Sequence, residues 1–154
     1  MGLTIPQLAQ RIIAAGLAQP DEIVGCNTEE IESVEAKFDI KLPQTYREWL
    51  EIMGRGAGHY LAGSDTFYPD ILQLREYAEE LLTENGNPFS LSPDAFVFLM
   101  HQGYQFLYFN TTPEHPDPPV MYYIEGEALE VRWQSLSDYY EQVLEDTIRL
   151  LQQL

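Results

Sequence analysis

The sequence predicts an α+β fold, in which an antiparallel sheet of hairpins is flanked by helices within a single domain. Four strand-like runs in the second half of the chain are joined in pairs by short turns that contain glycine. Such short connections pair strands antiparallel. Segments with helical periodicity come before and after these runs, which is the element order of an α+β domain. The 154 residues are enough for one domain with its own core.

The first helix has a clear start signal. Thr4 and Gln7 form a capping box around Pro6, so we predict a helix from there to about Ala15, ended by Gly16. The following stretch, 16–25, has little periodicity. We therefore divide the chain into residues 1–27, a helix and linker packed on the domain, and residues 28–154, the domain itself.

A second helix is expected after a cap at Asn27 or Thr28, with its buried stripe at Ile31, Val34 and Phe38. Glu32 and Glu35 are expected to point outward. A third helix begins at Pro43, because proline suits the first turn of a helix. Its apolar face is Tyr46, Trp49, Leu50 and Met53, and Gly54 is expected to end it with a left-handed cap.

The remaining elements follow from local patterns. Short extended pieces are predicted at 59–62 and 66–68, and a helix from Pro69 to the Asn85–Gly86 pair. The four strands are predicted at 95–100, 105–110, 120–124 and 129–133. A terminal helix begins at the Ser135 cap and runs to about Leu151.

Composition excludes several classes of partner. The net charge is −17, from 25 acidic and 8 basic side chains, and the isoelectric point is about 4.2. Phosphate repulsion therefore disfavours nucleic acid and anionic membranes. The same charge either serves solubility alone or steers a basic protein toward this one. Cys26 is the single cysteine, which suits a cytoplasmic protein, and neither a secretory leader nor a membrane span is expected.

The order of motifs resembles the SUKH superfamily, which includes the Smi/Knr cell-wall-assembly-regulator proteins. The most specific unit is Leu42–Pro43 followed by Tyr46 and Trp49, a glycine turn, and then the two hairpins and closing helix. The likeness covers about residues 28–150. It implies a protein-binding module, and many bacterial members are immunity proteins that neutralise a cognate toxin, frequently a nuclease. An adaptor or regulator of an endogenous protein is the alternative on the same fold.

Catalysis has little support in the sequence. His59, His101 and His115 lie in separate loops without the spacing of metal ligands, so neither a metal site nor a cofactor is expected. Cys26 has no basic neighbour in the sequence that would activate it. A hydrolase that uses two carboxylates stays as a third hypothesis, without a spacing that supports it. We expect no catalytic residues.

The expected contact surface lies in the C-terminal part of the chain, because this part has the largest excess of acidic residues. From Glu76 onward, Arg132 and Arg149 are the only arginine or lysine residues. Strand residues alternate between faces, so one set of aromatic residues should pack against the helices and the other should face the open side of the sheet. Exposed aromatic residues among acids favour a basic protein partner. The candidate partner-binding residues are Glu114, Asp117, Glu125, Glu127, Glu130 and Tyr104.

Overall fold

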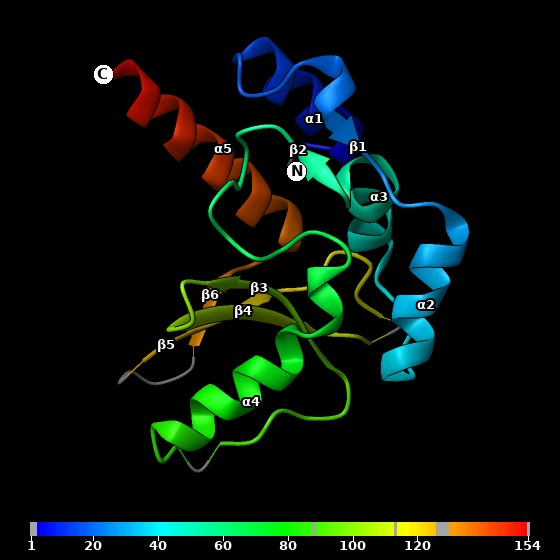
Figure 1. Cartoon of the computed structure of the whole chain (residues 1–154), viewed down its shortest axis with the longest axis vertical. Helices are drawn as coiled ribbons and strands as arrows, with labels where there is room; N and C mark the ends of the chain where they lie inside the picture. Colours follow the sequence, from blue (N-terminus) through cyan, green and yellow to red (C-terminus); the bar gives the residue numbers. More distant parts are fainter. Residues whose placement is uncertain (1–2, 88, 113, 126–129, 154) are drawn as a thin grey trace.

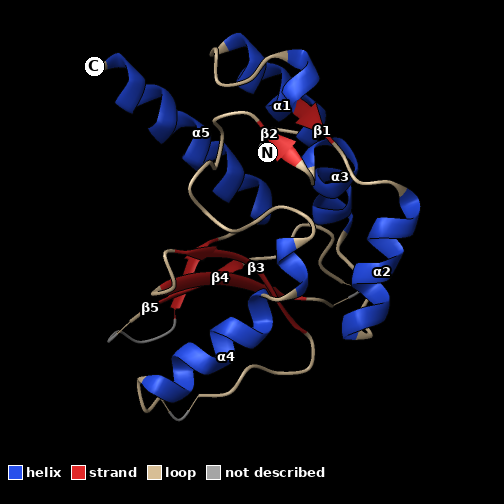
Figure 2. Ribbon diagram, in the orientation of Figure 1, coloured by secondary structure: helices blue, strands red, loops and turns tan. Residues whose placement is uncertain are grey.

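A computed structural model describes residues 3–87, 89–112, 114–125 and 130–153. Its central feature is an antiparallel sheet in the order β3-β4-β5-β6, which lies between two layers of helices (Figures 1 and 2). The helices α3 and α5 cover one face and α4 covers the other. The predicted α+β fold is confirmed.

The element bounds agree closely with most of the predictions. The α-helices are α1 (Ile5–Ala14), α2 (Thr28–Phe38), α3 (Gln44–Met53), α4 (Leu74–Glu84) and α5 (Leu136–Gln152). The strands of the main sheet are β3 (Ala95–His101), β4 (Gln105–Asn110), β5 (Val120–Ile124) and β6 (Glu130–Trp133). Two short 3-10 helices, η1 (Pro20–Glu22) and η2 (Asp70–Leu72), and the strand pair β1 (Ile23–Val24) and β2 (Gly56–Ala57) complete the described elements.

The predicted caps form as expected. Gln7 N donates to Thr4 Oγ1 at 3.3 Å, and Thr4 N donates to Gln7 Oε1 at 3.0 Å, which completes the capping box of α1. Asp138 N donates to Ser135 Oγ at 3.1 Å at the start of α5. The helix α1 then packs against α3 and α5, and its Leu8 and Ile12 belong to the same buried cluster as the rest of the core.

Two strand predictions are wrong. Residues 59–62 form turns, because Gly58 (φ 61°) and Leu61 (φ 60°) are both in the left-handed region and reverse the chain. Residues 66–68 are not a strand either, and the sheet contact in this region is a single bridge between Asp65 and Met100. The predicted helix after Pro69 is divided into η2 and α4.

The left-handed cap predicted at Gly54 is also wrong, because Gly54 has right-handed helical geometry with φ −62°. A Cβ atom at Gly54 would lie 2.7 Å from Cys26 Sγ, and one at Gly25 would lie 1.8 Å from the carbonyl oxygen of Glu51. The segment before α2 lies directly against the end of α3, where Cys26 N donates to Leu50 O at 2.8 Å. Only glycine fits at positions 25 and 54 because the two segments are so close.

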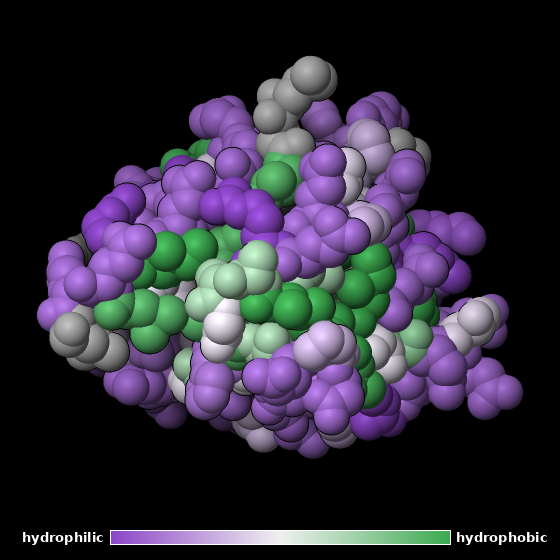
Figure 3. All heavy atoms as spheres, turned by 90° about the horizontal axis from the view of Figure 1, so that it is seen from above, coloured by the Kyte–Doolittle hydropathy of each residue, from purple (hydrophilic) through white to green (hydrophobic). Residues whose placement is uncertain are grey.

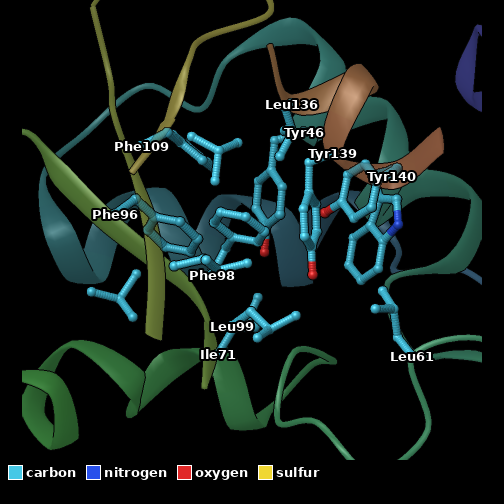
Figure 4. Packing of buried hydrophobic residues seen from close by; sticks show 14 of the residues in the cluster. Tyr46, Leu61, Ile71, Phe96, Phe98, Leu99, Phe109, Leu136, Tyr139 and Tyr140 are labelled. Carbon is cyan, nitrogen blue, oxygen red and sulfur yellow. The ribbon is translucent and has the colours of Figure 1, made fainter. Parts of the chain in front are cut away.

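The face of the sheet under α3 and α5 is an aromatic core. The Trp49 ring is parallel to the Tyr140 ring within 1°, with centroids 5.4 Å apart, and it also stacks on Tyr46 and Phe67. Figure 4 shows Tyr46, Tyr139 and Tyr140 beside the phenylalanine side chains of β3 and β4. The predicted apolar face of α3 is confirmed as core, since Tyr46, Trp49, Leu50 and Met53 are fully buried.

The second face of the sheet is not open as expected. Phe96 pairs with Phe109 on the aromatic side, so the next pair, Val97 and Tyr108, faces α4, and both of its members are buried. The helix α4 packs along β3 and reaches β5 through a 2.8 Å bond from Asn85 Nδ2 to Tyr123 Oη. On the edge strand β6, Val131 is 49% exposed.

Glu35 does not point outward as expected. Its Oε2 accepts from Leu42 N at 2.8 Å, and its Oε1 forms an ion pair with Arg47 Nη1 at 3.0 Å. This one carboxylate ties α2 to the chain that leads into α3. Asp39, which caps α2 with φ 52°, makes the sharp change of direction between the two helices.

Candidate partner-binding surface

The structure separates the predicted partner-binding residues into two groups. Glu114 and Asp117 follow β4 and precede β5, whereas Tyr104, Glu125 and Glu130 lie at the opposite ends of the strands. A five-residue strand such as β5 spans about 17 Å. The groups therefore lie at opposite ends of the sheet, and one small contact does not include both.

Asp117 is held by α5. Its Oδ1 accepts from Ser137 N at 3.0 Å, and its Oδ2 accepts from Ser137 Oγ. The carboxylate therefore anchors the link after β4 to the first turn of the helix. Glu114 is exposed on the same link.

The other group lies near the β3–β4 turn. Glu125 N donates to the carbonyl oxygen of Tyr104 at 2.9 Å, which joins the end of β5 to this turn. Glu130 pairs with Tyr122 across the strands and forms an exposed ion pair with Arg132 at 3.4 Å. Glu127 lies outside the described residues.

The strongest concentration of negative charge near this end is on α4. Glu76, Glu80 and Glu84 are exposed and follow each other at four-residue spacing, so they form one stripe along the helix. None of the described basic side chains forms an ion pair with any of the three. Like charges at this spacing destabilise a helix, so the stripe lowers the stability of α4.

Arg75, the only basic residue of α4, does little to neutralise the stripe. Its guanidinium donates inward to three carbonyl oxygens, those of Ser92 and Ala95 at 2.8 Å and that of Leu91 at 3.0 Å. Its one carboxylate partner is Glu79, with an Nη2–Oε2 distance of 3.7 Å. Arg75 thus fixes α4 to the chain before β3 and leaves the stripe unpaired.

The stripe borders a hollow that connects it with the predicted group. The hollow has a volume of about 280 Å³ and is lined by Glu80, Glu84, Tyr77, Asp65 and Gly103, together with Leu81 and Met100. Gly103 belongs to the β3–β4 turn, next to Tyr104. Tyr77 is 44% exposed, so this acidic surface also presents an aromatic side chain. Figure 1 shows the end of α4 and the β3–β4 turn on the same side of the molecule.

The candidate residues chosen from the sequence do not include the glutamates of this surface. The signal was present in the four-residue spacing of Glu76, Glu80 and Glu84, which lacks a lysine or arginine at the neighbouring i+4 positions. The spacing of residues along the sequence does not predict the tertiary contacts that turn Arg75 inward.

The single cysteine, Cys26, is buried beside Gly54 at the end of α3. Burial, reinforced by the neighbouring Glu30 carboxylate, raises the pKa of the Cys26 thiol to about 11, so it is protonated at neutral pH. Glu30 itself is ion-paired with Arg55, whose hydrogen bond holds the pKa of that carboxyl below its usual value. Among the described residues, no group of three histidine, cysteine or acidic side chains is arranged to hold a metal ion.

A second surface, at the end of the molecule that carries α1 and the last turns of α5, has an apolar patch surrounded by hydrophilic residues (Figure 3). Leu150 and Leu151 are exposed there by 63% and 44%. The neighbouring Asp146 and Arg149 form an ion pair with each other at 3.1 Å.

Comparison with protein-family models identifies the family of this chain. The model of the SMI1 / KNR4 family (SUKH-1) matches residues 25–142. The chain belongs to this family. The predicted resemblance is therefore confirmed, and the match extends from just before α2 through the sheet into α5, leaving α1 outside it.

A comparison with curated proteins gave no match. In the part of the chain that the structure describes, no helix combines the length and the apolar character needed to cross a bilayer.

Proposed function

We propose that this protein is a non-catalytic cytoplasmic binding protein that occludes a basic protein partner, and that it acts as an immunity protein against a toxin. Membership of the SMI1 / KNR4 family (SUKH-1) supports a binding role. The net charge of −17 supports a basic partner. A nuclease toxin fits this chemistry, because a site that binds nucleic acid is basic.

The observation that carries the proposal is the unpaired stripe of Glu76, Glu80 and Glu84. An arrangement that lowers the stability of its own helix is explained if the charge is needed for binding. The stripe borders Tyr77 and the β3–β4 turn, so it offers both charge and an aromatic contact. We place the contact surface here, together with Tyr104, Glu125 and Glu130 of the predicted group.

Occlusion by this surface would proceed in two stages. The acidic face attracts the basic partner over a distance of about a Debye length and speeds the encounter. Contacts made by Tyr77 and Tyr104 would then slow release. The partner's own active site is blocked by the bound domain, so no catalytic group is required.

The test begins with a pull-down from the source cell, after which the captured protein is purified and its association rate measured at rising salt. We expect the rate to fall with ionic strength, and the triple variant Glu76→Gln, Glu80→Gln, Glu84→Gln to lower it by about tenfold at low salt. The matched control is Glu29→Gln, Glu32→Gln, Glu145→Gln, which removes three exposed charges from other helices. An association rate that does not change with salt would contradict the electrostatic mechanism.

The captured partner's activity separates immunity from regulation. Inhibition of a toxic activity, such as nucleic acid cleavage, supports the immunity role. A partner with no toxic activity would instead assign the protein to the adaptor or regulator class, the alternative on the same fold. Turnover of glycoside or ester substrates by the protein itself would overturn its non-catalytic character.

A further inference from the structure

A cleft on another part of the molecule has the size and the lining of a pocket that receives a side chain from another protein. It lies between the connection from α2 to α3 and the link that follows β4, and it has a volume of about 470 Å³. That volume is within the range of small-ligand sites. The cleft is lined by Asp39, Ile40, Lys41, Leu42, Pro43, Gln44, Asp94, Thr111, Thr112, His115 and Pro116.

The walls of the cleft are braced by hydrogen bonds. Glu35 holds the α2–α3 side through Leu42 N. On the opposite side, Thr111 donates to the carbonyl oxygen of Asp94 from both its backbone N and its Oγ1, at 2.9 and 2.8 Å. The two sides are joined by a 3.0 Å bond from Thr45 N to Pro116 O. The cleft is therefore formed before any ligand arrives, which lowers the entropic cost of binding.

The polar groups of the cleft are short of partners. Among the described residues, the carboxylates of Asp39 and Asp94 have neither an ion pair nor a side-chain hydrogen bond. Both side chains are exposed, so a ligand in the cleft can reach them. The two carboxylates together offer acceptors to a ligand that carries several N–H donors.

The apolar groups of the cleft fit the stem of a long side chain. Ile40, Leu42, Pro43 and Pro116 supply hydrocarbon surface beside the two carboxylates. Lys41 is the one lysine or arginine of the lining, and the carboxylates outnumber it. A methylene stem that ends in a planar cation with several donors is the chemistry of arginine.

We propose that this cleft receives an arginine side chain of the protein partner. The inference rests on the proposed function, because it assumes a basic protein as the partner. It adds a specific anchor in a cleft whose lining does not include the α4 stripe. The guanidinium donates to the carboxylates of Asp39 and Asp94, while the stem packs on the apolar wall.

The experiment uses blocked tripeptides, acetyl-Gly-Arg-Gly-amide and its neutral isostere with citrulline in place of arginine. Amide chemical shifts of the full chain are followed by NMR as each peptide is added. We expect the arginine peptide to give saturable shifts at Thr112 and His115, and the citrulline peptide to bind at least about fivefold more weakly. Equal binding of the two peptides would overturn the proposal.

Variants then test the named groups. Asp94→Asn should weaken the arginine peptide by about fivefold, whereas Asp21→Asn, an exposed aspartate outside the cleft, should leave binding unchanged. Lys41→Gln should strengthen binding, because it removes a like charge. Stronger binding of acetyl-Gly-Glu-Gly-amide would overturn the proposal by making the cleft an anion site at Lys41 and the start of α3.

These outcomes are distinguishable from a failure of the proposed function. Shifts that appear along α4 but not in the cleft would overturn the arginine pocket and leave the acidic docking surface in place. Conversely, the arginine peptide could bind the cleft while the association rate with the captured partner does not change with salt. That result would support the arginine pocket and contradict the electrostatic docking mechanism.

Discussion

The two helical layers that cover the sheet differ in chemistry. The layer of α3 and α5 packs stacked aromatic rings on the sheet, with Trp49 between Tyr46, Phe67 and Tyr140. The layer of α4 buries leucine and alanine on one side and exposes unpaired glutamates on the other. The first layer holds the fold together, whereas the second gives up some stability and presents charge.

Under the proposed function, this difference places stability and recognition on different sides of one sheet. A charged stripe is tolerated on α4 because the aromatic layer supplies enough apolar burial to keep the domain folded. Arg75 links the two roles, since its inward hydrogen bonds fix α4 without neutralising the stripe. Perturbations of the two layers should therefore have different consequences.

The largest expected effect is on the aromatic layer. Trp49→Ala removes a fully buried ring from its stack and should lower the free energy of unfolding by about 3 to 5 kcal/mol. Tyr77→Ala on the exposed side of α4 should change it by only about 0.5 kcal/mol. Urea unfolding followed by circular dichroism measures both, and similar losses for the two variants would contradict the division of roles.

Alkaline pH should also act on the aromatic layer. Burial raises the pKa values of Tyr46, Tyr60, Tyr139 and Tyr140 well above the ordinary value. Unfolded phenols lose their protons near pH 10 while the folded ones keep them, so the unfolded chain binds fewer protons above that pH. Stability is therefore intact below pH 10 and falls above it, by about 1.4 kcal/mol per pH unit for each group.

The measurement is a pH titration with phenolate absorbance and circular dichroism recorded together. The buried tyrosines should ionise in the same transition that abolishes the secondary structure. Their ionisation in a protein that is still folded would show that the layer admits charge and is less tightly packed than described.

A smaller effect distinguishes two tyrosines of the same layer. Tyr60 Oη donates to the carbonyl oxygen of Tyr140 at 2.8 Å in a buried position, so Tyr60→Phe should cost about 1 kcal/mol. Tyr46 Oη is buried without a partner among the described residues, and Tyr46→Phe should be neutral or slightly stabilising. Thermal unfolding of the two variants checks the pair, and an equal loss would mean that Tyr46 Oη does have a partner.

The smallest effect has the opposite sign. Glu80→Gln relieves repulsion from both Glu76 and Glu84 and should raise the free energy of unfolding by about 0.3 kcal/mol. The control is Glu32→Gln on α2, where Glu32 is exposed and outside the α4 stripe. Guanidinium is unsuitable because its salt screens the charges, so urea at low ionic strength is the appropriate denaturant. A loss of stability at Glu80→Gln would remove the argument that the stripe is costly.

Most of the fold followed from the sequence because its signals are local. The Thr4 and Ser135 caps, the Tyr46–Met53 stripe and the two hairpins depend on residues a few positions apart. The errors have non-local causes. The conformation of Gly54 depends on the close approach of Cys26. Glu35 turns inward because it binds Leu42 N and Arg47. The face of the sheet that was expected to be open is covered by α4.

Less of the candidate surface could be read from the sequence, for the same reason. Acidity is readable from composition, but the position of Asp117 depends on its bonds to Ser137. The exposure of the α4 stripe depends on where Arg75 points. Neither contact has a signature in spacing, and the cleft beside Asp94 joins residues 39–44 to residues that lie at least 50 positions later in the sequence.

The contact between Gly25 and the carbonyl of Glu51 has a consequence for engineering this protein. Every side chain larger than hydrogen would push the segment before α2 away from α3, so Gly25 and Gly54 are the positions to hold fixed in any randomised library. The exposed positions of α4 are free to vary within the limits of helix propensity. A domain built in this way offers a rigid frame with one replaceable helix face, on which new binding specificities could be selected without rebuilding the core.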